Sequence, residues 1–194
     1  KAFPETVISV DTWKAKVALE AVRAGADIIN DISGLGFDPD LPGAAAESGA
    51  GLVLSHIQGT PRDMQKDPRY DDTVGDILCY FEERLSLAEK AGIPAERILL
   101  DPGLGFGKRR EDNLRILRNL DAFRIFGRPL LIGHSRKGFI GATLGLADPE
   151  DRLEGTLAVT ALCGLHNVAL VRVHDVEGNA RVLSMLSAVG ECLE

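Results

Sequence analysis

The stretch Arg97-Ile-Leu-Leu-Asp-Pro-Gly-Leu-Gly-Phe-Gly-Lys108 decides the fold, because in it an apolar strand runs into a carboxylate and a glycine-rich loop. Residues 98–100 are continuously apolar, which is typical of a parallel strand covered on both faces. Asp101 follows the strand directly, and the apolar spacing beyond the loop predicts a helix over residues 111–120. The stretch therefore predicts one strand–loop–helix unit with a polar side chain at the carboxyl end of its strand.

The same unit repeats along the chain. The expected strands are Thr6–Val10, Asp27–Ile29, Gly51–Ser55, Arg97–Leu100, Pro129–Gly133 and Ala169–Val173. The expected helices span residues 14–24, 72–91, 111–120, 152–165 and 176–188. Strands that alternate with helices in this way predict an α/β fold with a parallel sheet built from βαβ units.

A polar residue lies at or just past the carboxyl end of every expected strand. These residues are Asp11, Asn30, His56, Asp101, Ser135, and the pair Arg172 and His174. A doubly wound sheet concentrates its site at one switch point, whereas a TIM barrel gathers groups from all its strands at one face. We therefore expect a (β/α)8 TIM barrel with six of its eight units present. Residues 1–194 are expected to form a single domain, with two N-terminal βα units absent.

The composition excludes several classes of function. The 22 Lys and Arg against 29 Asp and Glu give a net charge of −7, and only 5% of the residues are aromatic, so a nucleic-acid-binding face is not expected. No apolar run approaches the roughly 18 residues that a membrane span needs. Three cysteines without metal-ligand spacing favour a reducing compartment, and we expect a cytoplasmic protein.

The glycine-rich loop matches neither a nucleotide-binding P-loop nor a dinucleotide fingerprint. Its glycines allow the backbone to approach a flat ligand closely, and Phe106 supplies an apolar wall. An ionised Asp101 would accept two hydrogen bonds, which suits a ring with adjacent N–H donors such as a 2-amino-4-oxopyrimidine. A plain turn with a helix cap is the alternative.

The other strand ends leave similar choices open. Asp11 either caps a helix or contacts a ligand, and Asn30 either caps a loop or reads an amide edge. His56 is either a hydrogen-bonded core residue or part of a site, and a long polar loop follows it.

Two basic segments predict an anion site. Ser135-Arg-Lys-Gly-Phe139 opens a helix, where free N–H groups attract negative charge and Lys137 adds a movable cation. A solvated basic turn is the alternative. Arg172 and His174 are two residues apart on a strand and so point to the same side. Arginine binds phosphate in a bidentate manner, which makes this pair a candidate for holding a phosphate.

These motifs together resemble dihydropteroate synthase, the transferase of folate biosynthesis. The matching segments occur in the family's order over nearly the whole chain: Val10-Asp-Thr12, Gly25-Ala-Asp-Ile-Ile-Asn-Asp31, His56 with Gly59-Thr-Pro61, Asp101-Pro-Gly-Leu-Gly-Phe-Gly-Lys108, Ser135-Arg-Lys137 and Arg172-Val-His-Asp175. The resemblance implies a barrel that condenses 6-hydroxymethyl-7,8-dihydropterin diphosphate with p-aminobenzoate to give 7,8-dihydropteroate and diphosphate. It also implies Mg²⁺ as cofactor and a homodimer.

The resemblance assigns roles to particular residues. Carried over by motif, the pterin is held by Asp11, Asn30, Asp101, Phe106 and Lys137. The resemblance implies that the p-aminobenzoate pocket is formed by Ser135, Arg136, Lys137 and Gly138, and that Arg172 and His174 bind the diphosphate. It also implies that the catalytic residues are Lys137, Arg172 and His174.

Two departures from the family pattern bear on activity. Gly138 stands where the family usually has a serine that docks the carboxylate of p-aminobenzoate. The N-terminal units of the family, with a loop asparagine that helps to bind Mg²⁺, have no counterpart here. A folate-dependent methyltransferase barrel and a non-catalytic pterin-binding module are the alternative functions.

Overall fold

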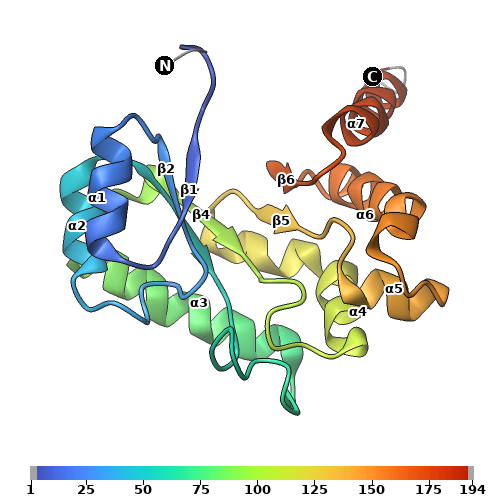
Figure 1. Ribbon diagram of the computed structural model, residues 1–194, viewed down its shortest axis with the longest axis horizontal. Helices are drawn as coiled ribbons and strands as arrows, with labels where there is room; N and C mark the ends of the chain where they lie inside the picture. The colour runs from blue at the N-terminus through green and yellow to red at the C-terminus, as the bar shows by residue number, and fades with distance from the viewer. Residues whose placement is uncertain (1–3, 192–194) are drawn as a thin grey trace.

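A computed structural model describes residues 4–191 of the chain, in which strands and helices alternate (Figure 1). The strands are β1 (Ser9–Asp11), β2 (Ile28–Asp31), β3 (Gly51–Ser55), β4 (Ile98–Asp101), β5 (Leu131–Gly133) and β6 (Leu170–Arg172). The α-helices are α1 (Ala15–Arg23), α2 (Leu41–Ser48), α3 (Thr73–Lys90), α4 (Arg110–Arg118), α5 (Gly138–Leu144), α6 (Leu153–Leu165) and α7 (Val176–Glu191). The short 3-10 helices are η1 (Ala95–Arg97), η2 (Leu120–Phe126) and η3 (Pro149–Arg152).

All the strand pairs are parallel and follow the order of the chain. β1 to β4 form one sheet in the order β1-β2-β3-β4, and β5 pairs with β6. A parallel bridge between Leu100 and Leu130 joins the two groups. A doubly wound sheet reverses its strand order at a switch point, and this arrangement does not. The prediction of a barrel topology over six consecutive units is confirmed by this order.

The convex face of the strands carries the apolar core. Ile29, Leu52, Leu54 and Leu100 are 0% exposed, and they belong to one cluster that also contains Phe81 of α3. Because side chains alternate along a strand, the neighbouring positions face the opposite, concave side. In Figure 1, α1, α2 and α3 lie beside β1–β4, while α5, α6 and α7 lie toward β5 and β6. The concave side therefore carries Asn30, Ser55 and Asp101 together with apolar residues such as Val53.

The two outer strands are less covered than the inner ones. Within residues 4–191, β1 pairs only with β2, and β6 pairs only with β5. Ser9, Asp11, Leu170 and Arg172 are all exposed, whereas Val53 on the inner strand β3 is fully buried. The described strands thus form an open arc of six.

Two helical segments differ from the sequence prediction. α2 was not expected, because its sequence has a glycine and no clear apolar stripe, although the proline in its first turn suits a helix start. The helix expected over 111–120 ends at Arg118, and the backbone continues into η2. Between residues 4 and 191, no helix is both long and apolar enough to cross a bilayer.

Candidate functional site

A cavity of about 300 Å³ lies at the carboxyl ends of β5 and β6. Its lining is Gly133, Ser135, Lys137, Arg172, Val173 and His174. Four of these six residues belong to the anion site predicted from the sequence. The structure therefore brings the Ser135–Gly138 turn and the end of the last strand together around one space.

Lys137 connects this cavity to the glycine-rich loop. Its ammonium donates a hydrogen bond to the backbone carbonyl of Leu104 and lies 4.6 Å from the centroid of the Phe106 ring. At Gly105, φ is +80° and a Cβ would lie 3.1 Å from the lysine Cδ, so the loop packs closely under this side chain. Burial lowers the pKa of Lys137 to about 8. Lys137 thus lines the cavity and also contacts the Phe106 ring of the glycine-rich loop.

Asp101 is 3% exposed at the end of β4. One carboxylate oxygen, Oδ1, accepts a hydrogen bond of 2.8 Å from the N–H of Gly103. Burial raises the pKa of Asp101, and the nearby charges of Lys137 and Arg172 act in the opposite direction. Asp101 is therefore within electrostatic reach of both cations, so the predicted acidic and basic halves of the site are adjacent.

Asn30 is the second buried polar group on the concave face. It is 4% exposed, and neither its Nδ2 nor its Oδ1 has a hydrogen-bond partner among the residues that the structure describes. A buried amide without partners is rare in native proteins and points to a ligand or a water that completes it. Asn30 can both donate and accept, which suits the edge of a heterocycle.

Asp11 and Arg172 form an ion pair across the ends of the arc. Arg172 Nη1 donates to Asp11 Oδ2 at 3.0 Å, and both side chains are about half exposed. The family resemblance predicts that Asp11 holds the pterin and that Arg172 holds the diphosphate. The ion pair shows that these two side chains lie in direct contact.

Ser135 holds His174 in place. The Ser135 hydroxyl oxygen accepts a hydrogen bond of 3.2 Å from the backbone N–H of His174 and lies 2.9 Å from the imidazole Nδ1. This contact fixes the ring so that His174 stays at the rim of the cavity. Ser135 is 8% exposed, and its hydroxyl is already engaged with the neighbouring strand end.

The turn that follows Ser135 directs its side chains apart. Arg136 has a φ of +57°, its N–H donates to Thr156 Oγ1 at 3.0 Å, and its guanidinium pairs with Glu150. Arg136 therefore extends toward η3. Gly138 is the exposed first residue of α5, and a Cβ built on it meets no atom of the described chain within 4 Å.

His56 is a hydrogen-bonded core residue, which decides between the two interpretations left open by the sequence. Lys108 Nζ lies 2.8 Å from His56 Nδ1 and also donates to the carbonyl of Phe106 at 3.0 Å. Burial, together with the charge of Lys108, lowers the pKa of His56 to about 2, so the imidazole is neutral and Nδ1 accepts the hydrogen bond. Burial likewise lowers the pKa of Lys108 to about 7.

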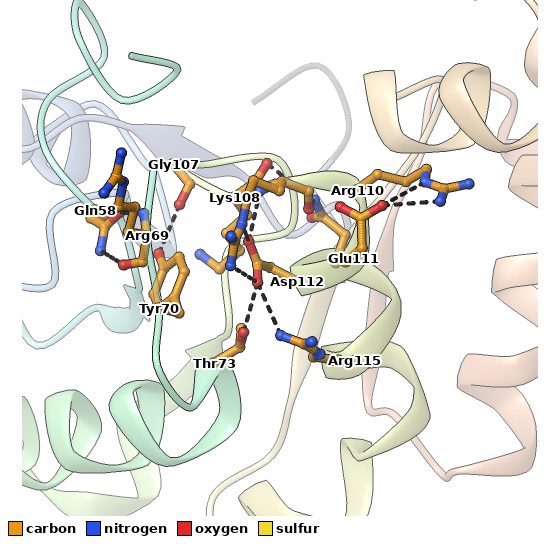
Figure 2. A network of polar contacts seen from close by, with 12 residues as sticks. Gln58, Arg69, Tyr70, Thr73, Gly107, Lys108, Arg110, Glu111, Asp112 and Arg115 are labelled. Atoms are coloured by element: carbon orange, nitrogen blue, oxygen red, sulfur yellow. Dashed lines mark hydrogen bonds and ion pairs between the residues drawn. The ribbon is translucent and has the colours of Figure 1, made fainter. Parts of the chain in front are cut away.

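A polar network braces the glycine-rich loop from outside (Figure 2). Tyr70 donates a hydrogen bond of 2.8 Å to the carbonyl of Gly107, and Thr73 donates one of 2.8 Å to Asp112. Asp112 is 0% exposed and also accepts from Arg109 at 2.8 Å. The loops after β3 and β4 are thereby tied together. The sequence did not indicate this network, because its members are far apart in the chain.

Ser55 was also missed by sequence reasoning. It is the last residue of β3, it is 2% exposed, and its hydroxyl has no hydrogen-bond partner within the described part of the chain. Its place follows from the strand register of the structure, because Ser55 follows Val53 by two positions and Val53 pairs in register with Asn30. That spacing places Ser55 on the concave face.

The described residues form no metal centre of their own. Over residues 4–191, no three His, Cys, Asp or Glu side chains gather as a metal site. A Mg²⁺ ion often binds through only one or two carboxylates together with water and the phosphates of a substrate.

Comparison with known proteins shows the family to which this chain is related. The model of the family described as "Pterin binding enzyme" matches residues 1–174. The dihydropteroate synthase of Synechocystis sp. is 42% identical over 182 residues, which are 94% of this chain and 63% of that protein. A protein of Mycobacterium bovis named "Inactive dihydropteroate synthase 2" is also 42% identical, over 97% of this chain and 60% of its own length.

Solved structures agree with the sequence comparison. The chain superposes on the dihydropteroate synthase of Yersinia pestis in a sulfonamide complex with a TM-score of 0.93 and 37% identity, covering 97% of this chain and 68% of that one. The Xanthomonas albilineans enzyme with 4-aminobenzoic acid gives a TM-score of 0.89 and 40% identity, covering 95% and 65%. The same enzyme with 7,8-dihydropteroate gives 0.88 and 38%, covering 95% and 69%. The chain spans less than two thirds of the length of the two curated relatives named above, 63% for the Synechocystis protein and 60% for the M. bovis protein.

Proposed function

This chain belongs to the dihydropteroate synthase family of pterin-binding enzymes, and we propose that it joins a pterin to p-aminobenzoate with release of diphosphate. The observation that carries the proposal is the adjacency of two unlike regions. Buried Asp101 and the amide of Asn30 form one region, and the cavity lined by Lys137, Arg172 and His174 forms the other.

The first region suits the heterocycle. Asp101 accepts hydrogen bonds from ring N–H groups, and the unsatisfied amide of Asn30 supplies both a donor and an acceptor. Phe106 and the stem of Lys137 wall the ring from the side of the glycine-rich loop. Asp11, which is paired with Arg172, closes the edge nearest to the leaving group.

The second region suits the diphosphate. During the reaction, the bond between the pterin methylene carbon and the diphosphate oxygen breaks, and its electron pair leaves with the diphosphate. The nitrogen lone pair of p-aminobenzoate forms the new bond to that carbon, and the nitrogen then loses a proton to water. Arg172 and His174 stabilise the developing negative charge, while Asp101 favours positive charge on the pterin.

The aromatic amine is placed beside Lys137 and the start of α5. The exposed N-terminus of α5 offers the backbone N–H of Gly138 for the carboxylate, without the hydroxyl of a serine. Ser135 and Arg136 shape this turn, Ser135 through His174 and Arg136 through Glu150. The solved Xanthomonas relative was crystallised with 4-aminobenzoic acid, which supports this choice of second substrate.

Three finer properties belong to the same proposal. We expect Mg²⁺ to accompany the diphosphate, a homodimer formed through the helices after residues 152 and 176, and a cytoplasmic location. The described residues supply no metal cluster of their own.

A pterin-binding module without turnover is the second candidate. The M. bovis relative named as inactive is as similar to this chain as the Synechocystis enzyme is, at 42% identity. Family membership by itself therefore supports pterin binding more strongly than catalysis.

One experiment separates the two candidates. The chain is mixed with 6-hydroxymethyl-7,8-dihydropterin diphosphate, with and without p-aminobenzoate and Mg²⁺, and diphosphate release is measured. Release that depends on p-aminobenzoate supports the synthase. Binding of the pterin without release favours the module, and absence of binding by calorimetry contradicts both. A parallel reaction with methyltetrahydrofolate tests the methyltransferase alternative.

A further inference from the structure

Ser55 carries a buried hydroxyl whose hydrogen-bonding capacity is unused. Its residue is 2% exposed, and Oγ has no partner anywhere in residues 4–191. Most buried side-chain polar atoms in native proteins have a partner, so an orphaned hydroxyl requires an explanation. Ser33 offers a contrast, because it is equally buried but its hydroxyl donates to Asp31 at 2.7 Å.

The strand register places Ser55 between the two groups assigned to the heterocycle. Ser55 pairs with Asp101 across β3 and β4, and Val53, two residues earlier, pairs with Asn30 on β2. Since residues two apart on a strand face the same side, and in-register neighbours share a face, Asn30, Ser55 and Asp101 all face the concave side. The unsatisfied amide and the unsatisfied hydroxyl therefore lie on neighbouring strands of one surface.

We propose that the Ser55 hydroxyl is a third hydrogen-bonding group for the bound heterocycle and helps to determine which ring the site accepts. The inference rests on the proposed pterin site. An ionised Asp101 only accepts hydrogen bonds, whereas a hydroxyl also donates one. Ser55 thus complements Asp101 by serving a ring nitrogen or carbonyl oxygen that the carboxylate cannot bind.

Because the Ser55 hydroxyl lacks a partner in the free protein, its removal should affect ligand binding and protein stability differently. In the free protein the Ser55 hydroxyl is buried without a hydrogen bond that would compensate for its desolvation. Its removal should therefore leave the melting temperature unchanged or higher. In the complex the same hydroxyl bonds the ligand, so its removal should weaken binding. A merely structural serine behaves in the opposite way, and Ser33→Ala, which deletes a bonded hydroxyl of equal burial, should lower the melting temperature.

The test compares wild type, Ser55→Ala and Ser33→Ala by calorimetric titration and thermal melting. The probes are 6-hydroxymethyl-7,8-dihydropterin and inorganic diphosphate. We expect Ser55→Ala to bind the pterin about tenfold more weakly, as for the loss of one hydrogen bond, with unchanged diphosphate affinity and no fall in melting temperature.

The other outcomes distinguish a failure of the role proposed for Ser55 from a failure of the proposed function. Pterin binding that is equal in wild type and Ser55→Ala overturns the role of Ser55 and leaves the proposed function intact. A loss of both affinity and stability makes Ser55 structural and also overturns the inference. If wild type itself does not bind the pterin, the proposed function fails and the inference fails with it.

Discussion

Lys137 and Arg172 carry the positive charge of the cavity, but the protein holds them in different ways. The ammonium of Lys137 is engaged by a backbone carbonyl and an aromatic ring, and burial lowers its pKa to about 8. Arg172 is about half exposed and is held by Asp11. The lysine is therefore fixed in the wall of the site, whereas the arginine faces the space where a multivalent anion would displace water.

Replacing Arg172 tests this division. Arg172→Ala should weaken binding of the pterin diphosphate by about 2 kcal/mol, because a charge-assisted hydrogen bond to phosphate is lost. The bare pterin should bind almost as well as to wild type. Calorimetry with both ligands measures the difference, and an equal loss for both would place Arg172 at the heterocycle instead.

Gly138 offers a gain-of-affinity test at the same scale. Since a Cβ there meets nothing within 4 Å of the described chain, Gly138→Ser should fold normally, with a free energy of unfolding within about 0.5 kcal/mol of wild type. The added hydroxyl should tighten p-aminobenzoate binding by about 1 kcal/mol in the presence of the pterin and diphosphate. Gly138→Ala supplies the control that adds only the methyl group, and equal affinities of the two variants would refute docking at this turn.

At the scale of elements, the site depends on how the loops after β3 and β4 are joined to α3 and α4. Thr73 begins α3 and Asp112 lies in the first turn of α4, so their hydrogen bond connects two helix N-termini beneath the glycine-rich loop (Figure 2). Burial by itself raises the pKa of Asp112, but hydrogen bonds from Arg109 and Thr73 outweigh it and hold the pKa below the usual value. The Asp112 carboxylate is thus charged, and both of its oxygens accept hydrogen bonds.

Asp112→Asn should destabilise the protein by about 2 kcal/mol. The single carbonyl oxygen of the amide cannot accept hydrogen bonds from Thr73 and from both the backbone N–H and the guanidinium of Arg109 at once. Urea unfolding at pH 7 measures the loss. Glu111→Gln is the matched control, since the neighbouring Glu111 pairs only with Arg110 at the surface and its removal should change stability by less than about 0.5 kcal/mol. Comparable effects of the two substitutions would contradict a bracing role.

At the scale of the whole molecule, two buried bases couple global stability to pH. In the folded protein the pKa of His56 is about 2, so the imidazole stays neutral until the pH falls to that value. In the unfolded chain the same residue takes up a proton near pH 6.5. The unfolded state therefore binds more protons between these values, and stability is lost as pH falls below 6.5. For Lys108, with a folded pKa of about 7 against 10.5, the same reasoning makes stability rise from about pH 7 upward.

His56→Asn isolates the acidic window. The amide oxygen keeps an acceptor for Lys108 but does not titrate. Between pH 6.5 and 4, the unfolding free energy of wild type should fall more steeply than that of the variant, by up to about 1.4 kcal/mol per pH unit. Urea titrations at several pH values measure both slopes, and parallel slopes would mean that the folded imidazole becomes protonated.

The same scale shows what the sequence could predict. Strand order and the polar strand ends were predictable, because apolar runs and their flanking residues are local in the chain. The pairing of His56 with Lys108, the direction of Arg136 and the burial of the unpartnered Ser55 hydroxyl depend on packing between distant segments. The residue types at these positions are compatible with several roles, and only the tertiary structure selects among them.

The pairing of each strand with its successor in the chain has a consequence for how the molecule assembles. Every new strand adds to an edge made by the residues just before it, so loop closure is short at each step and growth by successive units is favoured. β3 lies inside this order and pairs along both edges, whereas β1 and β6 each pair on one side within the described residues. Native-state hydrogen exchange should accordingly find the slowest amides in β3 and progressively faster ones toward both outer strands.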